Sequence, residues 1–172
     1  MEKVKKLVGE VRSDPSKREE MFREVCRYVV EKVKSTRASV WSFNAAGTAI
    51  VCDCMLDDLE GKYSSGTRLN EDDFPQYFKA IKDDLKVVAP DARTHPATAC
   101  FRDAYFDPLD IKSLLDFVVL AGKEPVGILC CEHCGEIKHW SAADADVLHQ
   151  LSTVLGLVWR QKPRPSAGAA GL

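Results

Sequence analysis

The stretch SLLDFVVLAGKEPVGILCCEHC, residues 113–134, decides the fold class of this chain. Both halves are rich in apolar and β-branched residues, and Gly122 and Lys123 separate them, which predicts two long strands joined as a hairpin. The runs ASVWSFN (38–44) and TAIVCDCML (48–56) predict an earlier hairpin, linked near Gly47. Two hairpins interleaved with helices predict an antiparallel sheet covered by helices, and not a parallel sheet of β–α–β units.

Helical spacing of apolar residues surrounds the predicted strands. It occurs in residues 4–11, 22–33, 74–81 and 147–158. Ser16 with Glu19, and Ser141 with Asp144, resemble capping boxes at the start of two of these helices. LKVVAP predicts a short strand, and DARTHP a turn into a further helix that has Pro96 near its first position and ends near Phe106.

This order predicts one domain with additions at both ends. We expect a lead-in amphipathic helix in residues 1–15, a domain in residues 16–160, and a disordered tail or linker in residues 161–172, where PRPSAGAAGL has no apolar face. A chain of 172 residues is long enough for a single full core.

Composition excludes several classes of partner. The chain is 45% hydrophobic and 29% charged, with a net charge of −2, which is typical of a soluble globular protein. The local positive cluster, Lys3, Lys5 and Lys6, has acidic neighbours and predicts a solvated face without a role in nucleic-acid binding. The charged amino terminus and the absence of a long apolar run predict a cytoplasmic protein that does not contact membranes.

Seven cysteines without an export signal predict free thiols and no disulfide framework. Cys131 and Cys134 have C-x-x-C spacing, with His133 and His139 nearby, but a zinc site needs four ligands and a second C-x-x-C is missing. By alternation Cys52 and Cys54 point the same way, so a composite metal site with the last strand stays open as an alternative. We favour cysteine as a packing residue of the strand.

Catalytic motifs are absent from the sequence. It contains no G-x-x-x-x-G-K-[ST], no G-x-G-x-x-G after a strand, no H-E-x-x-H and no G-x-S-x-G. The adjacent carboxylates Asp57 and Asp58, and Asp72 and Asp73, are typical of turns and caps. We therefore expect a protein that is not an enzyme.

Several short motifs in linear order resemble the GAF domain family over about residues 16–160. They are VWSF, GTRL, DFPQYFKAIK, VVAPDARTHP, YFDPLDIKSLLDFVV and PVGILCCEHCGEIKHWSAADADVLHQL. The resemblance implies an α+β fold, an α/β/α sandwich with a six-stranded antiparallel sheet. The terminal helices lie on one face, where they often pair two protomers, and short helices with a long loop cover a pocket on the other. Relatives carry an E-H-x-G turn, here Glu132 to Gly135, without metal.

The resemblance implies a sensory domain that binds a small molecule and signals through its terminal helices to a fused or separate output domain. The ligand and any cofactor remain unidentified, and the N-K…F-x-x-x-D-E pattern of GAF domains that bind cyclic nucleotides is absent. The broad apolar stripes of the first and last helices favour a homodimer. The alternatives are a redox or metal-binding protein, including a methionine sulfoxide reductase-like enzyme using Cys52, Cys54, Cys100 or Cys130, and a pure dimerisation module.

Candidate ligand-binding residues come from several segments. Asp91, Arg93, Thr94 and His95 precede the helix predicted from Pro96, and free N–H groups at a helix start favour an anionic ligand group. Aromatic residues supply the wall of the pocket and its closure, and polar residues project from the strands. These further candidates are Tyr63, Phe74, Tyr77, Phe78, Tyr105, Phe106, Asp116, Cys130 and Glu132.

Overall fold

The structure is a computed structural model that describes residues 1–159, and the predicted tail lies outside them. Among these residues no helix is long and apolar enough to cross a membrane. Its main helices are α1 (Glu2–Ser13), α2 (Arg18–Val33), α3 (Pro75–Asp84) and α4 (Ala142–Trp159). The strands are β1 (Arg37–Phe43), β2 (Ala49–Asp57), β3 (Lys62–Ser64), β4 (Arg68–Asn70), β5 (Lys86–Ala89), β6 (Ile111–Ala121) and β7 (Glu124–Cys134).

The strands form one antiparallel sheet in the order β3-β2-β1-β7-β6-β5, and β4 also pairs with β2. Both predicted hairpins are present, as β1–β2 and β6–β7. The sheet has seven strands where six were expected. The additional pairing arises because the polar segment after β2 pairs with β2 through the short strands β3 and β4.

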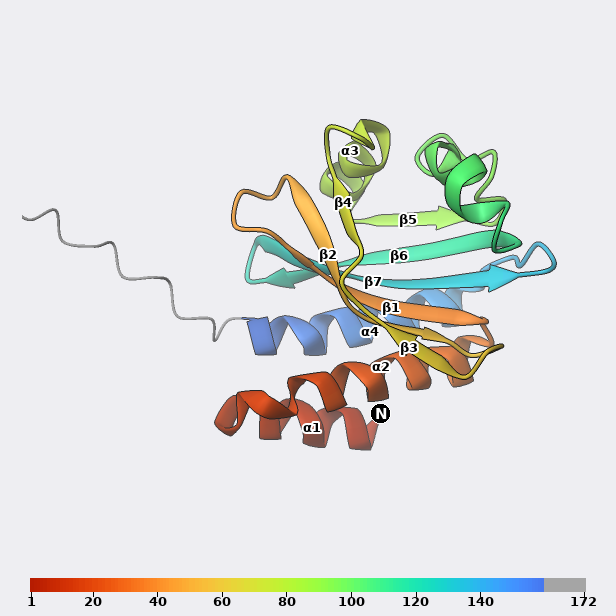
Figure 1. Ribbon diagram of the computed structural model, residues 1–172. Coiled ribbons are helices and arrows are strands. Elements are labelled where there is room, and N and C mark those ends of the chain that lie inside the picture. Colours follow the sequence, from red (N-terminus) through yellow and green to blue (C-terminus); the bar gives the residue numbers. More distant parts are fainter. Residues whose placement is uncertain (160–172) are drawn as a thin grey trace, which may run out of the picture.

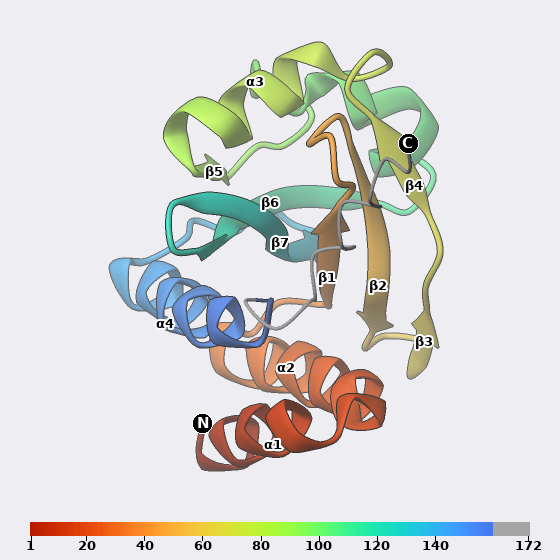
Figure 2. The ribbon, with the colours of Figure 1, turned by 90° about the vertical axis from the view of Figure 1, so that its left-hand side faces the viewer.

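Helices cover both faces of the sheet (Figure 1). α2 and α4 lie against one face and α1 lies beyond them, while α3 and the helical residues 99–106 lie over the other face (Figure 2). The structure therefore has the predicted α+β architecture, and the sheet separates two hydrophobic cores. The core between the sheet and α1, α2 and α4 is called the helical core, and the other lies between the sheet and α3 with residues 99–106. In β1, Ala38 and Val40 belong to the helical core and Trp41 to the opposite core, as the alternation of a strand requires.

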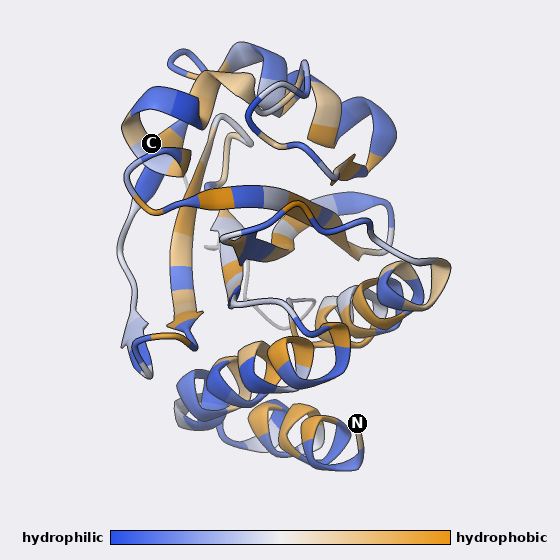
Figure 3. Ribbon diagram, turned by 90° about the vertical axis from the view of Figure 1, so that its right-hand side faces the viewer, coloured by the Kyte–Doolittle hydropathy of each residue, from blue (hydrophilic) through white to orange (hydrophobic). Residues whose placement is uncertain are grey.

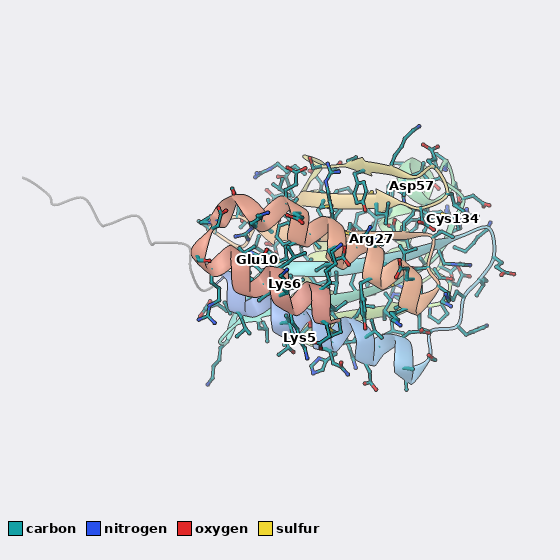
Figure 4. The ribbon with its side chains drawn as sticks, turned by 90° about the horizontal axis from the view of Figure 1, so that it is seen from below. Lys5, Lys6, Glu10, Arg27, Asp57 and Cys134 are labelled. Carbon is teal, nitrogen blue, oxygen red and sulfur yellow. The ribbon has the colours of Figure 1, made fainter. Side chains whose placement is uncertain are left out.

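The lead-in helix α1 buries its apolar stripe within its own chain. Val4, Leu7, Val8 and Val11 belong to the same core as α2 and α4, and the hydropathy of α1 and α2 changes in bands along each helix (Figure 3). Lys5 and Lys6 are exposed on the α1 ribbon, which lies in front when the molecule is seen from its helical side (Figure 4). The outer surface of this layer is therefore largely polar.

One predicted capping box is confirmed and the other is wrong. At α4 the Ser141 N–H donates to Asp144 Oδ2 at 2.8 Å, and the Asp144 N–H donates to Ser141 Oγ at 3.1 Å. At α2 the Asp14 carboxylate instead accepts from the Ser16 N–H at 3.0 Å and stabilises a 3₁₀ turn, Pro15–Lys17. Ser16 is thereby held inside that turn, and α2 begins after it.

The helix predicted from Pro96 to Phe106 is largely wrong. Residues 91–98 form bends and turns, and helical structure begins with a 3₁₀ turn, Ala99–Phe101, and continues as a π-helical turn, Arg102–Phe106. The Arg93 guanidinium donates to the carbonyl oxygens of Ile111 at 2.9 Å and Phe106 at 3.2 Å. These contacts with later residues hold the segment as a compact loop, which local propensity does not predict.

A β-bulge overturns the expectation that Cys52 and Cys54 share a face. Val40 pairs with Cys54 and Trp41 pairs with Cys52, so Asp53 is the additional residue in β2. Cys54 consequently lies in the helical core, whereas Cys52 lies in the core under α3. The composite metal site that needs both thiols on one side is therefore not assembled.

Candidate functional site

A cavity of about 400 Å³ lies between the sheet and residues 99–106. It opens on the face of the sheet opposite α2 and α4, and the sheet, α3 and β4 contribute to its wall. Its lining residues are Arg37, Trp41, Ile50, Met55, Ser64, Thr67, Leu69, Phe74, Tyr77, Cys100, Phe101, Ala104, Tyr105, Phe106, Leu114, Asp116, Cys130 and Glu132.

Aromatic side chains form much of this wall. The ring centroid of Phe101 lies 4.6 Å from that of Phe74, 5.0 Å from that of Tyr77 and 5.8 Å from that of Phe106. These spacings are typical of packed aromatic pairs. The cluster joins α3 to the helical residues 99–106, so it fixes the wall opposite the sheet.

Asp116 places a buried carboxyl group in this apolar cavity. Asp116 is 0% exposed, and its Oδ2 accepts a hydrogen bond from the Tyr77 hydroxyl at 2.7 Å. Its Oδ1 has no hydrogen-bond partner within residues 1–159. Burial raises the pKa of Asp116 to about 7, although the Cys130 thiol and the Tyr77 hydroxyl oppose the rise.

A second polar group lies where β1, β2 and β7 meet. Arg37 pairs with Glu132 at 3.1 Å and also with Asp57, and its side chain is only 8% exposed. The Tyr105 hydroxyl donates to the same Glu132 carboxylate at 2.9 Å. Burial raises the pKa of Glu132 while Arg37 opposes the rise. This network ties the helical residues over the cavity to the central strands.

The structure brings part of the predicted binding set together. The cavity wall includes Phe74, Tyr77, Tyr105, Phe106, Asp116, Cys130 and Glu132. Phe78 points into the core beside Phe43 and Tyr77 and is fully buried. Phe78 was wrongly assigned to the cavity because successive side chains of a helix point in different directions, and only the face of α3 that carries Tyr77 meets the cavity.

Tyr63 and the segment before Pro96 lie elsewhere. Tyr63 lies on β3 with the Arg23 guanidinium 4.7 Å above its ring, and it lines a different hollow. Asp91, Arg93, Thr94 and His95 lie in turns outside the cavity wall. Their expected role at a helix start is wrong because that helix does not form: Asp91 Oδ1 accepts from the Arg93 N–H, and His95 Nδ1 accepts from the Ala97 N–H.

Sequence reasoning missed the residues of the first hairpin and of the edge strands. Arg37, Trp41 and Met55 line the cavity, as do Thr67 and Leu69. The signal for Arg37 is its alternation with Trp41 along one strand, with an arginine placed among apolar neighbours. Thr67 and Leu69 carry no comparable signal, because Leu69 enters the wall through the pairing of β4 with β2, and Thr67 precedes β4 and accepts a hydrogen bond from the Cys52 N–H of β2.

The cysteine-rich end of β7 is divided between the two faces, as alternation predicts. Cys130 lies in the core beside the cavity and Cys131 in the helical core. Within residues 1–159 no group of three or more histidine, cysteine, aspartate or glutamate side chains is arranged to hold a metal ion. Cys100 is the exposed cysteine of the cavity wall, and partial burial raises its pKa.

Comparison with protein families matches residues 17–159 to the GAF domain. The chain belongs to the GAF domain family. The match covers the sheet, α2 and α4, and leaves α1 outside it. A comparison with curated proteins found no match.

Solved GAF domains share this fold at low sequence identity. The phycoerythrobilin-bound GAF domain of a cyanobacterial phytochrome has a TM-score of 0.72 and 15% identity, and the match covers 92% of this chain and 93% of that one. The cyanobacteriochrome receptor PixJ has a TM-score of 0.69 and 14% identity, covering 84% and 95%. The GAF domain of a phosphoenolpyruvate-protein phosphotransferase from Coxiella burnetii has a TM-score of 0.68 and 18% identity, and the match covers 91% of this chain and 90% of that one. These matches establish the GAF fold of the chain.

Proposed function

We propose that this GAF domain is a non-enzymatic sensor that binds a compact small molecule in the cavity lined by Asp116. The observation that carries the proposal is a fully buried carboxyl group in an aromatic cavity whose Oδ1 has no hydrogen-bond partner among residues 1–159. A buried polar atom without a partner costs free energy, and a ligand that supplies the missing hydrogen bond recovers it.

The residues that line the cavity favour one chemical class of ligand. A cavity of about 400 Å³ with aromatic walls suits a small, largely apolar or aromatic molecule. With a pKa of about 7, Asp116 is partly ionised near neutral pH and accepts a hydrogen bond from an N–H or O–H group of the ligand. A ligand with a protonated amine or a ring N–H fits both features.

The signalling path in this proposal runs through the sheet. Tyr105 belongs to the helical residues that cover the cavity, and its hydroxyl donates to Glu132 on β7. Glu132 in turn pairs with Arg37 on β1. The opposite faces of β1 and β7 carry α2 and α4. A ligand shifts these helices only if it binds one arrangement of the Tyr105–Glu132–Arg37 group more tightly than another.

Membership of the GAF family supports the wider part of the proposal. Neighbours of known structure include bilin-binding photoreceptors and GAF domains of signalling proteins. In this chain the exposed Cys100 thiol lies on the cavity wall. We accordingly propose a cytoplasmic sensor that passes its signal to a fused or separate output domain, and a homodimer that pairs through the first and last helices. Leu157 of α4, which is exposed, supports such a pairing surface.

A thermal-shift screen tests the proposal with defined probes: small aromatic amines, nitrogen heterocycles, a linear tetrapyrrole and a cyclic nucleotide. We expect at least one amine or heterocycle to raise the Tm of the wild type, and Asp116→Leu to abolish that shift. Asp103→Leu, which alters a largely exposed carboxylate, is the matched control and keeps the shift. Equal shifts in both variants would refute a role for Asp116.

A further inference from the structure

Two thiols outside the cavity lie close together on the helical side of the sheet. Cys26 of α2 and Cys54 of β2 have their Sγ atoms 4.0 Å apart, and the Cys26 thiol also lies 3.8 Å from the carbonyl oxygen of Cys54. The bulge at Asp53 is the reason for this proximity, because it turns Cys54 toward α2. An S–S bond of about 2.05 Å would require the two sulfur atoms to approach by roughly 2 Å from this separation.

The two thiols differ in protonation. The Cys26 thiol donates its hydrogen bond toward Cys54, and this contact lowers the pKa of Cys54 and raises the pKa of Cys26. The Arg23 guanidinium also lowers the pKa of Cys54, whereas its burial and the carboxylates of Glu19 and Asp53 oppose the change. Cys54 is therefore the first of the pair to form a thiolate, while Cys26 keeps its proton.

The two thiols also differ in access. Cys54 lies on the wall of a hollow of about 450 Å³, between the start of α2 and strands β2 and β3, together with Arg18, Arg23 and Ser64. Cys54 is 3% exposed and Cys26 is 0% exposed. Cys54 therefore borders a hollow that is open to solvent, whereas Cys26 does not border it.

We propose that Cys54 and Cys26 form a peroxide-reactive dithiol, with Cys54 as the attacking thiolate and Cys26 as the resolving thiol. The Cys54 sulfur attacks a peroxide oxygen, so an S–O bond forms, the O–O bond breaks, and the alcohol or water of the peroxide leaves after taking a proton. Cys26 then attacks the Cys54 sulfenic acid, so the S–S bond forms and water leaves. The two thiols are oxidised by two electrons and one peroxide is reduced.

The product would couple oxidation to the helices of the sensor. A Cys26–Cys54 disulfide joins α2 covalently to β2 across the interface where they pack. This site lies on the opposite side of the sheet from the cavity, so the inference is independent of the ligand proposed above.

The test treats the full chain with one equivalent of hydrogen peroxide and maps its peptides by mass spectrometry without reduction. We expect a Cys26–Cys54 cross-linked peptide lighter by two hydrogen atoms, and a fall from seven to five thiols titrated after denaturation. The exposed Cys100 is the internal competitor. Oxidation of Cys100 or Cys134 while Cys26 and Cys54 remain thiols would overturn the proposal.

Variants separate the two roles. In Cys26→Ser, dimedone should trap a sulfenic acid at Cys54 and no cross-link should form; in Cys54→Ser, Cys26 should stay a thiol. Cys52→Ser is the matched control, since Cys52 is two residues from Cys54 but lies on the other face, and it should keep the cross-link. Circular dichroism confirms that each variant is folded, and loss of the cross-link in folded Cys52→Ser would count against the pair.

Discussion

The buried carboxyl group of Asp116 makes stability depend on pH. Its pKa is about 7 in the folded chain and about 3.8 in a model peptide. The folded state therefore holds the proton more tightly, and folding stability falls as pH rises from about 4 through 7. Over this pH range the buried Asp116 carboxyl group therefore lowers the free energy of unfolding as it ionises.

This linkage gives a prediction for Asp116→Asn. The wild type should lose on the order of 2 kcal/mol of unfolding free energy between pH 5 and pH 8, at about 1.4 kcal/mol per pH unit over the titrating range. The variant should lose much less, because its amide does not ionise. Urea unfolding at the two pH values measures the difference, with Asp103→Asn as the exposed control. A pH dependence unchanged in Asp116→Asn would contradict the burial argument.

Arg37 and Glu132 give a prediction about a buried ion pair. Their side chains are 8% and 5% exposed, so removing the arginine leaves a buried charge without its partner. Arg37→Met should lower the unfolding free energy by about 3 kcal/mol. In a Glu132→Gln background the same change should cost at least about 1 kcal/mol less, because the buried Glu132 carboxylate is no longer left unpaired and only the partly exposed Asp57 loses its partner. Additive losses in the double-mutant cycle would show that the two groups do not interact.

At this scale, alternation predicted the cavity residues of regular strands and failed at irregular ones. Asp116, Cys130 and Glu132 lie in long paired strands, and the structure places them on the cavity wall as the sequence suggested. Cys54 lies next to a bulge, which reverses its face and which the sequence pattern does not mark. The Cys26–Cys54 pair was missed for the same reason.

Among the elements, α4 packs against β6 without room for a side chain at Gly156. A Cβ there would lie 2.1 Å from the Leu120 carbonyl oxygen, which is a backbone atom with no freedom to move aside. Gly156→Ala should destabilise the protein by about 2 kcal/mol although alanine favours helices. The measurement is the midpoint of urea unfolding.

Gly9 of α1 is the matched control for this change. A Cβ there meets nothing within 4 Å, so only helix propensity acts, and Gly9→Ala should stabilise by about 0.5 to 1 kcal/mol. Changes of opposite sign in the free energy of unfolding for Gly156→Ala and Gly9→Ala would support the close packing of α4 on β6. A stabilising Gly156→Ala would mean that α4 sits further from the sheet.

Elements with strong periodicity were predicted well. The two hairpins, α1, α2, α3 and α4 all follow patterns of apolar residues that local sequence carries. The short strands β3 and β4, and the helical turns of residues 99–106, depend on pairing with β2 and on the contacts of Arg93. Such long-range contacts have no local signature, so the conformation of this part of the cavity wall could not be predicted from sequence, although Tyr105 and Phe106 were among the candidate residues.

For the whole molecule, the proposed homodimer is open to measurement. α1 already uses its apolar stripe within its own chain, so pairing has to rely on the remaining exposed part of the helical layer, including Leu157. Light scattering coupled to size exclusion should give about twice the chain mass of 19.1 kDa. Leu157→Glu should reduce it to the monomer value, with Leu59→Glu, on another exposed leucine, as control. A monomer mass for the wild type at tens of micromolar would rule out a stable dimer.

Binding of a small molecule in the cavity beside Asp116, as proposed, can be observed directly. The most direct measurement compares native and denaturing mass spectra of the wild type and of Asp116→Leu, each incubated with the strongest probe from the thermal-shift screen. We expect an added mass that the wild type carries natively and loses on denaturation, and that Asp116→Leu carries little or not at all. A bare polypeptide in both native spectra, or equal loading of both proteins, would contradict it.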